Sequence, residues 1–595
     1  MGERSKRFRL PKAIRSQHKN IGEFGTLTEE KIDRHFFHRL ANLAKVKRFV
    51  AGWLILMSLI LLIGFLQLSF LRDKYQNLYF TPGGTFTEGI VGTYTNANPI
   101  YASSSVDSSV SKLLFAGLLT YDSNQKLIPD LAESITANKK GKVYTVTLRP
   151  DLYWHDGQPL TANDVLFTFK TIQNPDAKSY LLPSWQGIEI SATDERTVTF
   201  ELPSTLSSFP DSLTTGILPE HVLKDIPPER LRASDFNTVR PIGSGPFKYD
   251  TVEVQIDEEA EPETRREQIG LIANDGYYKG QPGIKRYVIN TYDTEDKLVT
   301  AYDEKKVDAI SGLGTIKKEY REDEDSNVYS IPVAGQTMVF FKNSQGILSD
   351  TKVRRALVLG ADRYKVMQST GQILKRSDEP LLIGQLGYDR KYAQKTTNSR
   401  AARQILDKAG WKLNPATGIR SKGNTELRLK LYALSNNEYE KVANELKNEW
   451  REIGVDVQTN LQGEEDLKNT VSSRSYDALL STISIGADPD VFAFWHSSQN
   501  DARSRARLNF SEYESAKADI SLEGGRSRID PKIRAVKYQT FLKVWNNDNP
   551  ALALYQPNYT FVVRSPFTGF DNSSLISPVY RYSDVDKWMI KQERR

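Results

Sequence analysis

Six histidines are the first candidates for chemistry in this chain of 595 residues, which contains no cysteine. None of them lies in a zinc-protease HExxH motif, and there is neither a GxSxG nucleophile elbow nor a GxxxxGK[ST] phosphate-binding loop. His155 and Asp156 could form an acid–base pair, but adjacent residues in a turn point apart, which favours a structural turn. The sequence therefore predicts a protein that is not an enzyme and that binds neither a cofactor nor a metal ion.

The clearest pattern of structural elements lies between residues 118 and 172. Residues 144–148 alternate apolar and polar side chains, which is the period of a strand with one buried face. A His-Asp-Gly turn follows at residues 155–157, and Thr161 with Asp164 forms a capping-box pattern ahead of an apolar helical face. This stretch predicts a strand, a turn and a helix.

A second pattern covers residues 427–457. Residues 427–431 alternate as a strand, a helix with one apolar face follows, and residues 455–457 begin another strand. A strand, a crossover helix and a second strand pair in parallel with a right-handed connection. The order predicts an α/β fold in which the loops at the carboxyl edge of the sheet carry function.

The stretch at residues 118–172 resembles the signature region of the family 5 extracellular solute-binding proteins, the oligopeptide-, dipeptide- and nickel-binding components of ABC transporters. The family pattern is a PxLAxS-like segment followed by YxxxLRxxxxWxDGxPLTAxDV. The matching residues are Pro129, Leu131, Ala132, Tyr144, Leu148, Arg149, Trp154, Asp156, Gly157, Pro159, Leu160, Thr161, Ala162, Asp164 and Val165. The resemblance extends over residues 86–580 and implies a two-lobed, periplasmic-binding-protein-like α/β fold of class II with an extra nested subdomain.

An apolar run at Phe49–Leu71 holds 23 residues without a charge. At about 1.5 Å per residue, a helix of this length spans the ~30 Å hydrocarbon core of a membrane. A cleaved signal peptide is the alternative, but its apolar region is shorter, at about 7–15 residues, and no small-x-small cleavage site follows Leu71. The run therefore predicts one transmembrane helix.

The charge of the chain is concentrated ahead of this run. The net charge is +6, and residues 1–48 hold 13 Lys or Arg against 5 Asp or Glu. The positive-inside rule then predicts a single-pass protein of the plasma membrane with a cytoplasmic N-terminus and an extracytoplasmic globular part. Anionic lipid head groups account for the basic tail, so no nucleic-acid partner is predicted.

The candidate recognition loop is residues 481–498, STISIGADPDVFAFWHSS. It resembles, in shortened form, the family segment GWxADYxDPxxF, in which an Asp of peptide binders receives the α-amino group. The resemblance implies that Asp488 binds a peptide amine, because a buried cation needs a charged acceptor. The alternative, that Asp488 and Asp490 only shape an Asx-Pro turn, stays open.

Other candidates for ligand contact come from residues 90–103, which resemble the family segment that ends in LNP and runs along the cleft. Together with Asp488 and Asp490, the predicted ligand-binding residues are Tyr94, Asn96, Tyr101, Trp185, Gln336 and Trp495. Aromatic side chains are also common core residues, so a packing role is the alternative for each of them.

The predicted organisation has six parts. They are a basic cytoplasmic tail (1–48), a transmembrane anchor (49–71), a juxtamembrane linker (72–85), a first lobe (86–290) with a nested subdomain at 118–210, a second lobe (291–554), and a return to the first lobe (555–595).

The predicted function is that of a monomeric, membrane-anchored solute-binding protein. It captures peptides or a related small solute by lobe closure and delivers them to the permease subunits of an ABC importer. A surface sensor or chaperone-like module that keeps the fold without an importer is one alternative. An extracytoplasmic hydrolase that acts through carboxylates is the other, because the chain has 74 acidic residues.

Overall fold

The computed structural model describes residues 47–75, 78–257, 264–314, 316–501 and 507–594. Its contacts divide the chain into two units, one holding the N-terminal helix and the other residues 80–592. Most of the predicted basic tail, residues 1–46, lies outside the described residues.

The first unit contains helix α3 (Lys47–Tyr75), which includes the whole predicted span Phe49–Leu71. Within it, the 22 residues Lys47–Leu68 have a mean hydropathy of 2.6 and are long and apolar enough to cross a membrane. No residue of that window is buried inside the structure. The helix is therefore a candidate for a single transmembrane span by its length and composition.

A seven-stranded sheet forms the base of the first lobe. Its order is β13 (Ser326–Pro332), β23 (Asn558–Arg564), β12 (Ala309–Ser311), β2 (Thr85–Val91), β11 (Arg286–Tyr292), β10 (Thr264–Ala273) and β9 (Phe247–Asp257). The central strand β2 runs parallel to both β11 and β12, and β23 pairs antiparallel with β12 and β13. Strands from the start, the middle and the end of the chain therefore share one sheet.

A buried ion pair fastens this sheet to the C-terminal segment. Glu88 on β2 is fully buried, and Arg581 of η8 (Pro578–Lys587) donates to it from Nε at 3.1 Å and Nη2 at 3.0 Å. The hydroxyls of Tyr287 and Tyr582 also donate to Glu88, at 2.6 and 2.5 Å. Arg581 reaches the hydroxyl of Ser109 on α4 (Ser105–Leu114) as well. The carboxylate thus holds three separate segments together.

A four-stranded antiparallel sheet follows β2 in the chain. Its order is β5 (Ala132–Ala137), β6 (Val143–Leu148), β8 (Thr197–Glu201) and β7 (Glu189–Ala192), and α5 (Ala162–Gln173) packs against it. The predicted capping box of α5 is confirmed, because Asp164 accepts from the Thr161 N–H at 2.8 Å while Thr161 caps the first turn. The predicted strand, turn and helix are therefore present.

The second lobe is built on a six-stranded sheet. Its order is β15 (Lys375–Arg376), β22 (Ala551–Gln556), β14 (Gly335–Phe341), β21 (Ala478–Ser484), β19 (Arg428–Leu434) and β20 (Asp456–Gln462). The predicted crossover is confirmed, since β19 and β20 pair in parallel through α15 (Asn437–Glu452).

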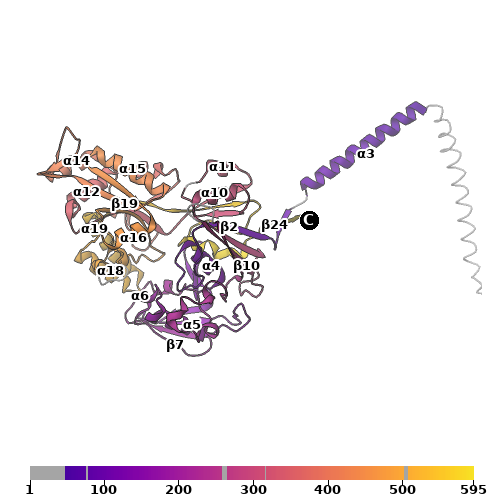
Figure 1. Cartoon of the computed structure of the whole chain (residues 1–595), viewed down its shortest axis with the longest axis horizontal. Coiled ribbons are helices and arrows are strands. Elements are labelled where there is room, and N and C mark those ends of the chain that lie inside the picture. The colour runs from indigo at the N-terminus through magenta and orange to yellow at the C-terminus, as the bar shows by residue number, and fades with distance from the viewer. Residues whose placement is uncertain (1–46, 76–77, 258–263, 315, 502–506, 595) are drawn as a thin grey trace, which may run out of the picture. The chain divides into compact units, whose positions relative to one another are not determined.

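Helices cover both faces of this sheet. In Figure 1, α12 (Thr351–Gly360), α14 (Ser399–Lys408) and α15 lie on one side of β19, and α18 (Ala516–Arg526) and α19 (Pro531–Asp548) lie on the other. Each helix layer buries its own apolar cluster against the sheet. The second lobe is therefore a three-layered α/β structure.

Two short connections join the sheets. Val333 and Ala334 lie between β13 and β14, and Pro557 lies between β22 and β23. Strands β12 and β13 belong to the first sheet, whereas the sequence prediction assigned residues from 291 onward to the second lobe. Alternation in a sequence shows that a strand is present but not which sheet it joins, and that explains the difference.

Replacing Arg581 with Met should lower the free energy of unfolding by about 3–5 kcal/mol, because it leaves the buried Glu88 carboxylate without its cation. Urea unfolding followed by far-UV circular dichroism measures the loss. The double variant Glu88→Gln/Arg581→Met removes both charges and should be more stable than Arg581→Met alone. Equal stabilities of the single and double variants would contradict this account of the pair.

Candidate functional site

A cavity of 680 Å³ lies between the two lobes and is the candidate binding site. Its size falls within the usual range for small-molecule sites. Residues of the first lobe that line it include Asn124, Gln125, Asp211, Ser573 and Ser574, and residues of the second lobe include Lys375, Gln385, Asp488, Arg534 and Gln556. A ligand in this cavity would therefore contact both lobes.

Three amide side chains of the cavity are fixed by hydrogen bonds to the backbone. The Nε2 atoms of Gln125, Gln385 and Gln556 donate to the carbonyls of Leu575 at 3.1 Å, Gly486 at 2.8 Å and Val333 at 2.8 Å. Because these bonds orient the amides, the cavity wall presents preorganised polar groups of the kind that bind a peptide main chain.

Asp488 lies in this cavity but is already bound within the protein. Nη2 of Arg534 on α19 donates to both of its carboxylate oxygens, at 2.6 and 2.7 Å, and the Asp490 N–H donates to Oδ1 at 3.0 Å. Arg534 is itself held by a bond from Nε to the Gly525 carbonyl at 2.9 Å. The negative charge of Asp488 is therefore neutralised by a fixed guanidinium.

Asp490 joins the lobes instead of lining the cavity. Its Oδ2 accepts from the hydroxyl of Ser208 in the first lobe at 2.9 Å and from Arg526 on α18 at 3.2 Å. The Ser207 N–H donates to the Arg526 carbonyl at 2.9 Å. Residues 207 and 208 are thus hydrogen-bonded directly to the second lobe.

Asp211 on the short helix α7 (Phe209–Ser212) was not predicted from the sequence. Its Oδ1 accepts from the hydroxyl of Tyr121 at 2.7 Å. Burial raises its pKa to about 6, and the negative charges of Asp488 and Asp490 add to this effect. A single acid in a segment without periodic pattern gives no sequence signal, since only folding brings it to the cavity.

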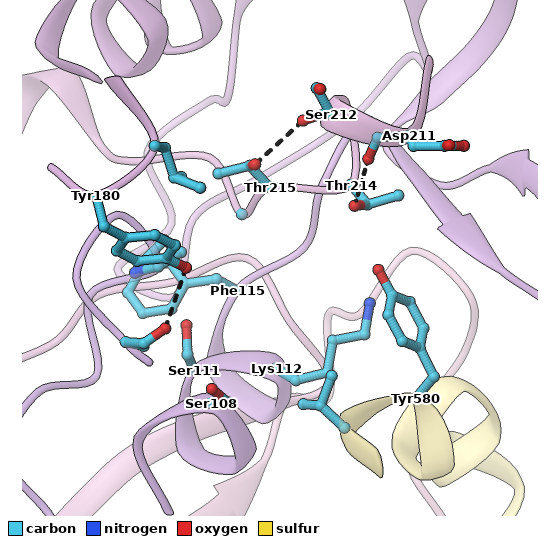
Figure 2. A pocket seen from close by; sticks show the side chains of 15 residues that line it. Ser108, Ser111, Lys112, Phe115, Tyr180, Asp211, Ser212, Thr214, Thr215 and Tyr580 are labelled. Atoms are coloured by element: carbon cyan, nitrogen blue, oxygen red, sulfur yellow. Dashed lines mark hydrogen bonds between the residues drawn. The ribbon is translucent and has the colours of Figure 1, made fainter. Parts of the chain in front are cut away.

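Asp211 also lines a second pocket, of 320 Å³, which is shown in Figure 2. Lys112 of α4 reaches into this pocket, where its Nζ donates to the Thr120 hydroxyl at 3.1 Å and lies 4.9 Å from the centre of the Tyr580 ring. Burial lowers the pKa of Lys112. Tyr180 stands on the opposite side of the pocket in Figure 2. The two pockets therefore meet at Asp211.

The predicted contacts in residues 90–103 are bound inside the first lobe. The hydroxyl of Tyr94 donates to the Asn237 carbonyl at 3.2 Å, and that of Tyr101 donates to the Ala177 carbonyl at 2.7 Å. Asn96 accepts from the Asn98 N–H at 2.9 Å.

The other three predicted contacts are also buried. The ring of Trp185 stacks on Phe169 at 3.9 Å, Trp495 packs against Phe340, and Gln336 donates to the carbonyls of Glu379 and Leu381 at 2.7 and 3.0 Å. Of the eight predicted residues, Asp488 lines the cavity between the lobes. Ligand contact by the other seven stays a prediction.

His155 and Asp156 have different partners. His155 Nδ1 accepts from the Gly243 N–H and its Nε2 donates to the Gly245 carbonyl, both at 3.1 Å, while Asp156 pairs with Nε2 of His221 at 2.8 Å. Burial lowers the pKa of His155 to about 4, so this imidazole is neutral at pH 7. The two residues therefore hydrogen-bond to different partners around a turn and do not form an acid–base pair with each other.

Two α/β lobes with a polar cavity between them are the architecture of the periplasmic-type binding proteins. The sequence model of one protein family, the bacterial extracellular solute-binding proteins, family 5 (middle region), matches residues 126–504. The chain belongs to this family. Members of the family are extracytoplasmic substrate-binding proteins of ABC transporters. The resemblance seen in the sequence is thereby confirmed.

The similarity of the chain to two binding proteins supports this assignment. The oligopeptide-binding protein AppA of Bacillus subtilis is 24% identical over 521 residues, which cover 85% of this chain and 92% of AppA. A putative ABC transporter peptide-binding protein of Brucella ovis is 26% identical over 529 residues, which cover 82% of this chain and 90% of the relative.

Solved structures share the fold. The complex of Bacillus subtilis AppA with a nonapeptide has a TM-score of 0.71 at 23% identity, and the match covers 86% of this chain and all of AppA (100%). The complex of Campylobacter jejuni NikZ with Ni(L-His) has a TM-score of 0.72 at 25% identity, covering 85% of this chain and 99% of NikZ.

The pairing of Asp488 with Arg534 can be tested by a double-mutant cycle. Arg534→Met should reduce the free energy of unfolding by about 1.5–3 kcal/mol, because it leaves a largely buried carboxylate without its cation. Asp488→Asn combined with Arg534→Met should recover part of this loss. Chemical unfolding of the four proteins gives the coupling energy, and a value near zero would show that the two side chains do not interact.

Proposed function

We propose that this chain is a membrane-anchored, extracytoplasmic solute-binding protein that captures peptides, or a related small solute, and delivers them to an ABC importer. The observation that carries the proposal is the 680 Å³ cavity, whose polar wall is contributed by both lobes. The names of the relatives add support, because they describe oligopeptide- and peptide-binding proteins.

Capture works by closure of the lobes. A ligand that contacts both walls stabilises the closed arrangement more than an open one, so binding shifts the equilibrium toward closure. The hydrogen bonds of residues 207 and 208 to the second lobe stabilise the same arrangement. The permease subunits then recognise the closed form.

Helix α3 is the anchor in this proposal, with the basic N-terminal tail in the cytoplasm and the globular unit outside. The protein acts as a monomer, binds no nucleic acid and catalyses no reaction. The relatives are named as binding proteins, which supports the last statement.

One observation favours a second candidate function. Asp488, the residue that the family resemblance implies as the amine anchor, is neutralised by Arg534. A surface sensor or chaperone-like module would keep the two-lobed fold but would not need a carboxylate that binds the amine of a ligand. A hydrolase acting through carboxylates has no such support.

Mass spectrometry tests the proposed ligand. The full chain is purified in detergent, denatured, and the released small molecules are identified. Recovered short peptides support the proposal, and recovery of a solute that is neither a peptide nor a peptide-like compound would contradict its ligand class. An empty protein whose melting temperature is unchanged by peptide pools would favour the sensor.

A peptide ligand should also raise the stability of the folded protein. At a concentration of 100 Kd, binding to the folded state adds about 2.7 kcal/mol to the free energy of unfolding, which is measured as a higher melting temperature. Analysis of the same peptides after incubation serves as the control for hydrolysis. New termini would show an enzyme and would contradict the proposal.

Because the chain contains no cysteine, a single introduced cysteine is its one thiol and can report the orientation of the anchor. Lys140→Cys places one thiol at an exposed position between β5 and β6, and Ser16→Cys places one in the predicted cytoplasmic tail. On intact cells, a membrane-impermeant maleimide should label the first variant and not the second. Labelling at Ser16→Cys would contradict the proposed topology.

A further inference from the structure

The cavity between the lobes contains a carboxylate without a counter-charge. Asp211 is half-buried, and its carboxylate accepts a hydrogen bond from the neutral hydroxyl of Tyr121. Among the described residues, no Lys, Arg or His nitrogen lies within 4 Å of it. In Figure 2 its side chain points away from the ammonium of Lys112, so the two line the pocket without pairing.

The two neighbouring acids differ from it. Asp488 is bound through both oxygens by Arg534, and Asp490 is bound by Arg526 and Ser208. Three carboxylates and two guanidiniums thus meet at this part of the cleft, and the unpaired negative charge is that of Asp211. Arginines of the second lobe neutralise Asp488 and Asp490, whereas no cation of the first lobe is paired with Asp211 in the described residues.

An isolated carboxylate away from water is costly, and a cation placed beside it offsets that cost. The groups that face Asp211 are Tyr121 on β3 (Leu119–Tyr121), Asp488 and Asp490 after β21, Arg534 on α19, and Tyr580 on η8. Burial is the main cause of its raised pKa, the two acids add to it, and Tyr121 and Arg534 oppose it. Arg534 is bound to Asp488, and Lys112 and Lys375, which line the same pockets, form no ion pair with Asp211 in the described residues.

We propose that Asp211 receives the positive charge of the ligand, a primary ammonium group, and that Asp488 does not. The inference rests on the proposed function and specifies the ligand-binding group within the same cavity. It places the charged contact on the first lobe, so a ligand can bind there before the second lobe closes over it. The ammonium is either the terminal amine of a peptide or the amine of a lysine side chain.

Calorimetric titration of the full chain in detergent tests this with three peptides of equal length. One is an alanine peptide with a free amine, the second is its N-acetylated form, and the third is N-acetylated and contains one lysine. Acetylation should weaken binding by about 10- to 100-fold, the loss expected when a charge-assisted hydrogen bond is removed. If the third peptide binds as tightly as the first, a lysine side-chain amine is sufficient for binding. If the third peptide binds as weakly as the second, the terminal amine is the group that Asp211 binds.

Asp211→Asn should bind the free-amine peptide and its acetylated form with equal, weakened affinity. Asp176→Asn, at an exposed position on η3 (Pro175–Ala177), is the matched control and should discriminate as the unchanged protein does. Discrimination that survives in Asp211→Asn would overturn the inference. Equal binding of both peptides by the unchanged protein would also overturn it and leave the proposed function standing, whereas failure to bind any peptide would contradict the proposed function itself.

The pH dependence of the unchanged protein gives a second test that needs no variant. A terminal amine, with a pKa of about 8, stays charged between pH 5 and pH 7, while Asp211 becomes protonated as the pH falls through about 6. The affinity for the free-amine peptide should therefore decrease from pH 7 to pH 5, and that for the acetylated peptide should change less. Parallel changes for both peptides would overturn the inference.

Discussion

The ion pair of Glu88 and Arg581 is the constraint on which the first lobe depends. The two residues are 493 positions apart in the chain, yet both are buried, and neither charge could remain there without the other. Their contact requires the chain to return after the whole second lobe has been built. The sheet is discontinuous in sequence, since β2 lies near the start of the globular chain and β23 near its end, and this is consistent with the same requirement.

The acids of the cleft also depend on whether a cation lies beside them. In the second lobe, Asp488 and Asp490 each have an arginine within 4 Å, so the charges of these two acids are neutralised within the protein. Asp211 in the first lobe has no such partner among the described residues. Among the three acids of the cleft, Asp211 is therefore the one whose charge the protein leaves without an ion pair in the described residues.

Local patterns were predictable from the sequence because their causes are local. The capping box of Thr161 and Asp164 and the crossover of β19, α15 and β20 depend on residues that are close in the chain. The site was less predictable. Arg534 lies 46 residues beyond Asp488, and Asp211 reaches the cavity from another lobe, so neither contact leaves a periodic pattern. For the same reason, β12 and β13 could not be assigned to a sheet in advance.

The two connections between the lobes form a single ribbon. Val333 donates its N–H to the Pro557 carbonyl at 3.0 Å, so the two crossing strands lie side by side where they leave one sheet for the other. A two-stranded ribbon bends easily out of its own plane but resists bending within it, because one strand would have to lengthen while the other shortened. The joint between the two sheets is therefore stiff in one direction and compliant in the other.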